Sequence, residues 1–192
     1  MKQQLLILLI SSLMPCQSFF AQCSTTTCTI PVPAINAQDA CILPNPQALN
    51  CYYGGTTPDL PQSFPPSWCT DIDNNHWFAF TATSSLAFFV FNVFGCTNGH
   101  SIQVGIFSTV DCIDFQTITS CTTISDVTSY TIIAPGMTIG QVYYMCIDGT
   151  DGALCQYSIN GQNTAINVVG SNNVCIPSSP VAQYSTPSLS SW

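Results

Sequence analysis

Eight short β-rich runs, separated by turn residues, fill residues 76–169 and constrain the fold more than any other feature. Short strands at close, regular spacing are typical of a β-sandwich or a jelly roll. We therefore predict an all-β fold, an antiparallel and jelly-roll-like β-sandwich. The runs cover residues 76–81, 86–94, 101–108, 115–120, 129–133, 142–147, 155–160 and 165–169.

Two of these runs differ in their side-chain alternation. Residues 101–107 place Ile102, Val104 and Ile106 on one face and polar or small residues on the other. This pattern predicts a half-solvated strand. Residues 86–94 are apolar on both faces, so we expect that strand to be central in its sheet or covered on both sides.

The remainder of the chain divides by composition. Residues 22–70 are rich in Pro, Cys, Thr and Gln and lack periodicity. We expect them to form an irregular, disulfide-rich segment packed on a sandwich of residues 71–169. Residues 170–192 are rich in Ser, Pro and Asn, which predicts a linker or the truncated tail of a longer protein.

The first 21 residues have the layout of a secretory signal peptide, with Lys2 before an apolar run at residues 5–14. That run is too short for a transmembrane helix, which needs roughly 20 apolar residues. Cleavage after Ser18 and after Ala21 both remain open, and Pro15 disfavours a lipoprotein modified at Cys16. We expect a secreted or cell-surface protein with no membrane insertion.

Charge restricts the partners of the mature chain. Lys2 is the only Lys or Arg in the sequence, and all nine acidic residues are Asp. Binding to nucleic acids and to anionic membranes depends on Lys and Arg, so we exclude both partners. An extracellular glycan or protein is the expected partner.

Twelve cysteines in an exported chain predict disulfides, because none has the spacing of a zinc site. Removal of Cys16 leaves an odd number, so one cysteine is free or pairs elsewhere, and Cys175 is the candidate. Most of the connectivity stays open at this point. The cysteines without an assigned partner are Cys23, Cys28, Cys41, Cys51, Cys69, Cys96 and Cys175.

Two pairings follow from spacing. Cys146 and Cys155 flank a turn-like sequence, and pairing them across a hairpin sets Tyr144 opposite Tyr157 on the same face. Cys112 and Cys121 have the same separation. We therefore predict disulfides Cys146–Cys155 and Cys112–Cys121, each closing a hairpin.

Residues 76–81, with the sequence His-Trp-Phe-Ala-Phe-Thr, are followed by Pro135-Gly136 and then by Tyr-Tyr-Met-Cys-Ile-Asp-Gly at residues 143–149. This combination resembles β-sandwich modules of secreted Bacteroidota surface and adhesin proteins, which are similar to pre-peptidase C-terminal and CUB-like domains. The likeness covers about residues 70–162 and departs from the pattern at residues 137–140, which look inserted. It implies a non-enzymatic binding, adhesive or folding role, in some members with type IX export, although no type IX sorting domain ends this sequence.

Catalytic signals are weak. The sequence has two histidines, His76 and His100, and no G-x-S-x-G nucleophile elbow. Its Asp residues form no evident glycosidase pair. We predict that the protein is not an enzyme, and an extracellular hydrolase is the least favoured hypothesis.

Two sets of side chains are candidate binding residues. Turn carboxylates supply the oxygen ligands that Ca²⁺ prefers, although Asp is also favoured in turns for its own backbone hydrogen bonds. Exposed aromatic rings can stack on sugars, although small sandwiches bury most of theirs. The candidates for structural Ca²⁺ are Asp71, Asp73, Asp148 and Asp151, and those for ligand binding are Tyr52, Tyr53, Trp68 and Trp77.

These features favour a secreted binding or adhesion module that recognises glycan or protein. The alternative is a structural spacer or surface-assembly subunit that binds no small ligand.

Overall fold

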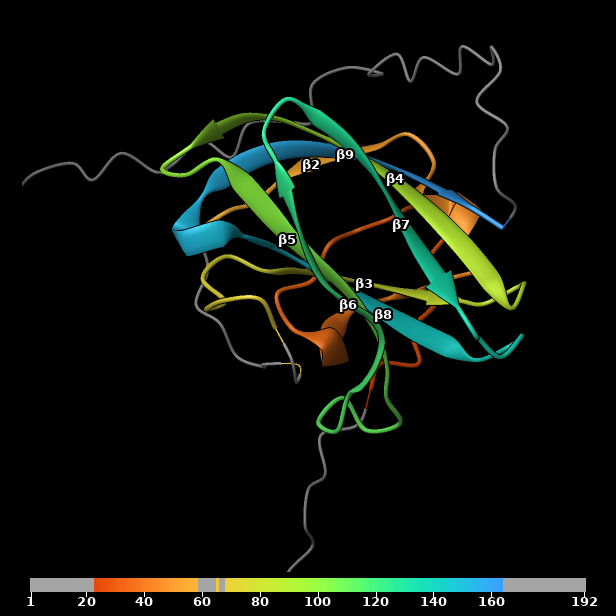
Figure 1. Ribbon diagram of the computed structural model, residues 1–192. Helices are drawn as coiled ribbons and strands as arrows, with labels where there is room; N and C mark the ends of the chain where they lie inside the picture. The colour runs from red at the N-terminus through yellow and green to blue at the C-terminus, as the bar shows by residue number, and fades with distance from the viewer. Residues whose placement is uncertain (1–22, 59–64, 66–67, 164–192) are drawn as a thin grey trace, which may run out of the picture.

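The computed structural model describes residues 23–58, 65 and 68–163, and in this part nine strands form two packed sheets (Figure 1). Sheet A contains, in spatial order, β1 (Ile42–Leu43), β3 (His76–Thr81), β8 (Val142–Gly149), β5 (Ser101–Ser108) and β6 (Gln116–Ser125). Sheet B contains β2 (Tyr52–Gly55), β9 (Leu154–Gln162), β4 (Leu86–Thr97) and β7 (Thr128–Pro135). Three short 3₁₀ helices accompany them: η1 (Ala37–Asp39), η2 (Pro46–Leu49) and η3 (Thr150–Gly152).

The predicted all-β sandwich is confirmed, and seven of the eight predicted runs form strands β3 to β9. Pairing is antiparallel except between β1 and β3. The eighth run, residues 165–169, lies outside the described residues, as do the predicted signal peptide and the tail at 170–192. Strands β1 and β2 arise within the segment predicted to be irregular, and each adds an edge to one sheet.

The main core lies between the two sheets. Phe78 and Phe80 of sheet A face Phe89 and Phe91 of sheet B, and all four side chains are buried. These rings alternate with outward-facing residues along β3 and β4, as the period-2 geometry of a strand requires. Leu49 of η2 joins this core.

A second core covers the outer face of sheet A. Trp77, Phe107 and Tyr144 project from that face and are buried. Trp77 stacks on Phe115 with ring centroids 5.3 Å apart, and Trp68 lies 6.2 Å from Phe107. We call the residues that lie over this face the cover, which comprises residues 23–41, 68–75 and 109–115.

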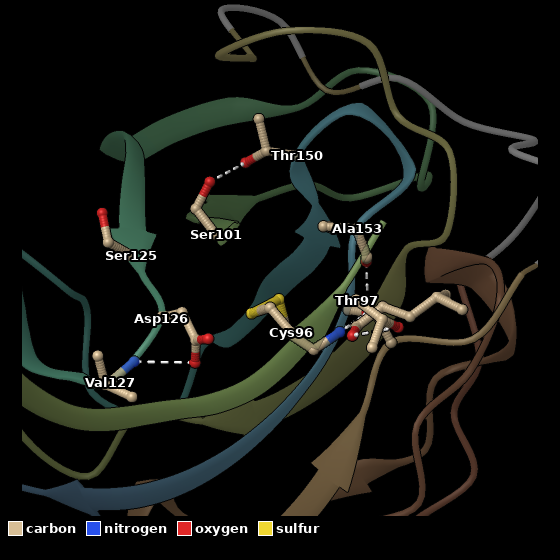
Figure 2. Close-up of a disulfide and its surroundings, with 12 residues drawn as sticks. Cys96, Thr97, Ser101, Ser125, Asp126, Val127, Thr150 and Ala153 are labelled. Carbon is tan, nitrogen blue, oxygen red and sulfur yellow. Dashed lines mark hydrogen bonds between the residues drawn. A yellow bond between two sulfur atoms is a disulfide. The ribbon is translucent and has the colours of Figure 1, made fainter. Parts of the chain in front are cut away.

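Disulfides fix the cover to the sheet and to itself. Each disulfide lowers the conformational entropy of the unfolded chain and so typically stabilises the fold by about 2 to 4 kcal/mol. Cys51 is also disulfide-bonded. Among the described residues the resolved pairs are Cys23–Cys112, Cys28–Cys41, Cys69–Cys121 and Cys96–Cys155, the last of which joins β4 to β9 (Figure 2).

The predicted disulfides Cys146–Cys155 and Cys112–Cys121 are wrong. Strands β8 and β9 are consecutive in sequence but belong to different sheets, so Cys146 faces the second core while Cys155 faces the main core. The spacing of Cys146 and Cys155 therefore does not reflect a hairpin. Cys112 and Cys121 have the same spacing, but they bond Cys23 and Cys69 instead. Cys146 is the free cysteine of the described residues, whereas Cys175, the candidate for the odd cysteine, lies outside them.

Strand β5 is not the half-solvated strand that its alternation predicts. Its polar face lies under the cover, where Gln103 is fully buried and accepts a hydrogen bond from the Thr70 backbone N–H at 3.1 Å. A Cβ on Gly105 would lie 2.9 Å from the Phe107 ring and 3.1 Å from the Trp68 ring, so glycine makes room for both rings. Strand β4 is central, as expected, but its outward residues remain partly exposed.

Candidate binding face

The outer face of sheet B has no counterpart of the cover among the described residues. Strand register places twelve side chains on this surface, which we call the neutral face. None of its four strands contains a charged residue or a histidine. The neutral face comprises Tyr53, Phe88, Val90, Asn92, Phe94, Ser129, Thr131, Ile133, Gln156, Ser158, Asn160 and Gln162.

An ordered aromatic pair lies at one end of the neutral face. The Tyr53 ring is 5.4 Å from the Phe94 ring, measured between centroids, and 46% of Tyr53 is exposed. The Tyr53 hydroxyl donates a hydrogen bond of 2.6 Å to Oε1 of Gln156. The ring is thus held by one contact on β4 and another on β9 while it stays open to solvent. Such a fixed ring binds a ligand with little loss of side-chain entropy.

A polar row crosses the sheet next to this pair. The strand register aligns Tyr53, Ser158, Asn92 and Ser129 on β2, β9, β4 and β7. Nδ2 of Asn92 donates to Oγ of Ser158 at 3.2 Å, which orients both groups. The row presents amide and hydroxyl groups, the donors and acceptors that can bind a hydroxylated ligand.

The far end of the neutral face is apolar. Phe88 pairs with Ile133 across β4 and β7, and Val90 pairs with Thr131. Phe88 and Val90 are half-buried, while 53% of Ile133 is exposed. About 20 Å of strand separates Phe88 from Phe94, at roughly 3.3 Å per residue. The face is therefore long enough to contact an extended ligand.

The structure separates the four aromatic residues predicted to bind ligand. Only Tyr53 lies on the neutral face. Tyr52 packs edge-on against Phe78 in the main core at 4.9 Å, and burial raises the pKa of its hydroxyl to about 12. Trp68 and Trp77 belong to the second core. Phe94 was not among the predicted ligand residues. It is the last residue of the run at 86–94, whose apolar side chains on both faces predicted a central or covered strand.

The four aspartates predicted to bind calcium divide in a similar way. Asp148 is fully buried, and its Oδ1 accepts the backbone N–H groups of Asp73 and Asn74 at 3.1 and 2.8 Å. Burial raises the pKa of the Asp148 carboxyl to about 6. Asp71 and Asp151 are exposed. No group of three or more metal-ligating side chains occurs among the residues that the structure describes.

The two histidines occupy different environments. His76 is buried between the sheets, with Nδ1 3.1 Å from the Tyr157 hydroxyl and Nε2 3.1 Å from Oγ1 of Thr57. Burial raises the pKa of Tyr157 well above its ordinary value, so its hydroxyl stays protonated. This hydrogen-bonded set links β3 to β9. His100 is exposed in the turn before β5.

A shallow depression of about 550 Å³ lies in the cover, on the side of the sandwich opposite the neutral face. Its walls are mostly polar and it is open to solvent. No aromatic ring lines it, unlike the neutral face. The lining residues are Cys23, Ser24, Thr25, Thr26, Gln38 and Asp39.

The disulfides are those of an extracellular protein, because the reducing cytoplasm does not maintain them. Within the described residues, no helix has the length and apolar character to span a membrane. Comparisons with protein-family models, curated proteins and solved structures found no match to this chain. The resemblance to Bacteroidota surface modules therefore stays a prediction.

Proposed function

We propose that the protein is an extracellular, non-enzymatic binding or adhesion module that holds a neutral glycan on the neutral face. The observation that carries the proposal is the aromatic pair of Tyr53 and Phe94 beside the oriented polar row. An aromatic ring packs against the C–H face of a sugar, while Asn, Gln and Ser side chains bond its hydroxyls.

Charge narrows the class of ligand. An anionic glycan would need a cation, and the mature chain has no Lys or Arg. A cationic ligand would be drawn to the Asp residues, which all lie outside the four strands of sheet B. A neutral saccharide matches a face that has aromatic, amide and hydroxyl groups and no charge.

A glycan array followed by calorimetry tests the proposal. We expect binding to neutral oligosaccharides that persists in a calcium chelator, because the neutral face has no carboxylate. Tyr53→Ala and Phe94→Ala should each weaken binding of a soluble, monovalent oligosaccharide by about tenfold, which corresponds to about 1.4 kcal/mol.

Tyr130→Ala is the matched control, because Tyr130 is 47% exposed and lies on the edge strand β7, outside the neutral face. Its affinity for the oligosaccharide should equal that of the wild type. Absence of binding on the glycan array, or equal losses of affinity in all three variants, would refute the proposal. Either result would favour a structural spacer or a protein ligand.

A further inference from the structure

The edge strands β6 and β7 lie on the same side of the sandwich and differ in how they are protected. Each is the last strand of its sheet, and a two-residue turn joins them. The free edge of a strand presents unpaired N–H and C=O groups to any other strand that approaches it. Most proteins therefore protect such edges with bulges, charges or covering segments.

Strand β6 carries two of these protections. Its register with β5 shifts between Val104 and Ile106 and again between Ile106 and Phe107. At this irregularity the Ile106 backbone N–H donates to the Thr119 side chain at 2.9 Å. The Cys69–Cys121 disulfide attaches the cover to the same strand. Strand β6 is therefore irregular and is tied to the cover.

Within the part of the chain that the structure describes, strand β7 has neither of these protections. It pairs with β4 through eight consecutive residues with no shift in register. Its sequence, Thr-Ser-Tyr-Thr-Ile-Ile-Ala-Pro, has no charged residue, and its Tyr130 and Ile133 are 47% and 53% exposed. Tyr130 is exposed although its register partner Phe91 is fully buried, because none of the strands that the structure describes lies beyond β7.

Charge makes this edge the place where a second copy of the same chain can pair, because β7 carries no charged residue. Every charged side chain of the mature chain is an Asp, so most contacts between two copies oppose like charges. An antiparallel pair of β7 strands avoids this. The carboxylate nearest to β7 in the sequence, that of Asp126, lies in the turn before the strand, where it accepts the Val127 N–H at 2.9 Å (Figure 2).

In such a pair, each Asp126 lies beside the Pro135 end of the partner strand. Eight residues span roughly 26 Å at 3.3 Å per residue. That separation exceeds the Debye length of about 8 Å at physiological salt, so the two carboxylates do not repel strongly.

We propose that two copies pair through β7, antiparallel about a two-fold axis. The four strands of each sheet B then form one continuous eight-stranded sheet. The two neutral faces join side by side, which gives a dimer two equivalent binding surfaces pointing the same way. The pairing is independent of what the neutral face binds.

Sedimentation of the secreted protein over a concentration series tests this pairing. The wild type should show a reversible dimer. Thr131→Asp, in the exposed middle of β7, should weaken dimerisation about tenfold or more, because each new carboxylate faces its copy and the mature chain holds no Lys or Arg to pair with it.

Thr123→Asp on β6 is the matched control, because it adds the same charge to the protected edge at another exposed threonine. It should leave the dimer unchanged, and both variants should unfold at urea concentrations close to that of the wild type. Hydrogen exchange supplies a second readout, since amides of β7 should become protected as concentration rises. A monomer at all concentrations, or equal weakening by both variants, would overturn the proposal.

Discussion

The two sheets of the sandwich differ in what lies on their outer faces. Sheet A is covered, so Trp77, Tyr144 and Cys146 are buried there, whereas sheet B leaves Tyr53 and Ile133 in contact with solvent. The cover makes sheet A the middle layer of three. Its strands should thus contribute more to stability, and the outer residues of sheet B are free to serve binding.

The comparison also shows that a strand's own pattern does not identify its solvent side. Strand β5 alternates and yet is buried on both faces, because Gln103 bonds to Thr70 in the cover. Strand β4 is apolar on both faces and yet keeps Phe88 partly exposed. A polar residue can be buried where a partner is available, and a binding surface can expose apolar ones.

The largest expected effect is the loss of a ring from the second core. Trp77→Ala should destabilise the fold by about 3 to 5 kcal/mol, because Trp77 is fully buried against Phe115. Phe88→Ala on the outer face of sheet B should cost much less. Urea unfolding measures both, and equal costs would show that sheet B is also covered. Trp77→Phe replaces the alanine variant if the latter is not secreted.

Releasing the cover should have the next largest effect. Replacing Cys69 and Cys121 with Ala removes a bond across 52 residues and should cost about 2 to 4 kcal/mol. Burial and the Asp148 charge raise the pKa of Cys146 well above its ordinary value, so this thiol is inert while the cover is closed.

Labelling with a thiol reagent should therefore be much faster in the Cys69→Ala, Cys121→Ala variant. Removal of Cys28–Cys41, which closes 13 residues within the cover, is the control and should accelerate labelling less. Unchanged labelling after removal of Cys69–Cys121 would contradict the role of that disulfide in holding the cover.

The pH dependence of stability provides a third comparison. Asp148 titrates at about 6 in the folded chain and near 3.8 when unfolded, chiefly because of burial. Its contribution to stability is therefore greatest below pH 4 and is lost as the pH rises through 6, by about 3 kcal/mol. Asp148→Asn should remove this dependence in urea unfolding between pH 4 and 7.

Asp111 is the control, because its pKa is shifted in the opposite direction to that of Asp148. Backbone N–H groups of Asp114 and Ile113 lower the pKa of its carboxyl. Its contribution is present above the pKa of the unfolded chain and is lost as the pH falls, so Asp111→Asn should alter only the acid side of the profile. If Asp148→Asn leaves the profile between pH 4 and 7 intact, the carboxyl is not buried as described.

The smallest effects should come from adding one hydroxyl to each outer face. Ala79→Ser buries a hydroxyl in the second core and should cost about 1 to 2 kcal/mol. Val90→Thr places a hydroxyl on the half-exposed neutral face and should change stability by less than about 0.5 kcal/mol. Thermal unfolding can resolve the difference, and a reversed order would mean that the two faces have been assigned the wrong way round.

Much of the fold could be predicted because strands are local features. The runs at residues 76–81, 101–108 and 142–147 coincide with strands, since their composition and flanking turns act over a few residues. Of the predicted ligand residues, only Tyr53 lies on the neutral face. Trp77 could not be assigned from its strand alone, because the residues that bury it come from distant parts of the chain.

The disulfide pairing also could not be predicted from the local sequence. Cys146 and Cys155 have a spacing that suits a hairpin, but the chain crosses from one sheet to the other between them. Cys112 instead bonds Cys23, which is 89 residues away. Spacing measures separation along the chain, whereas a disulfide depends on separation in space.

The sequence by itself determined the all-β class, the positions of the main strands, the scarcity of basic side chains, of which Lys2 is the only one, and the presence of disulfides. These follow from residue type and from neighbours a few positions apart. Tertiary structure alone decided which sheet is covered, which cysteines meet and which apolar face remains open. Those outcomes depend on contacts between segments far apart in the chain, and a strand's own two-residue period carries no information about them.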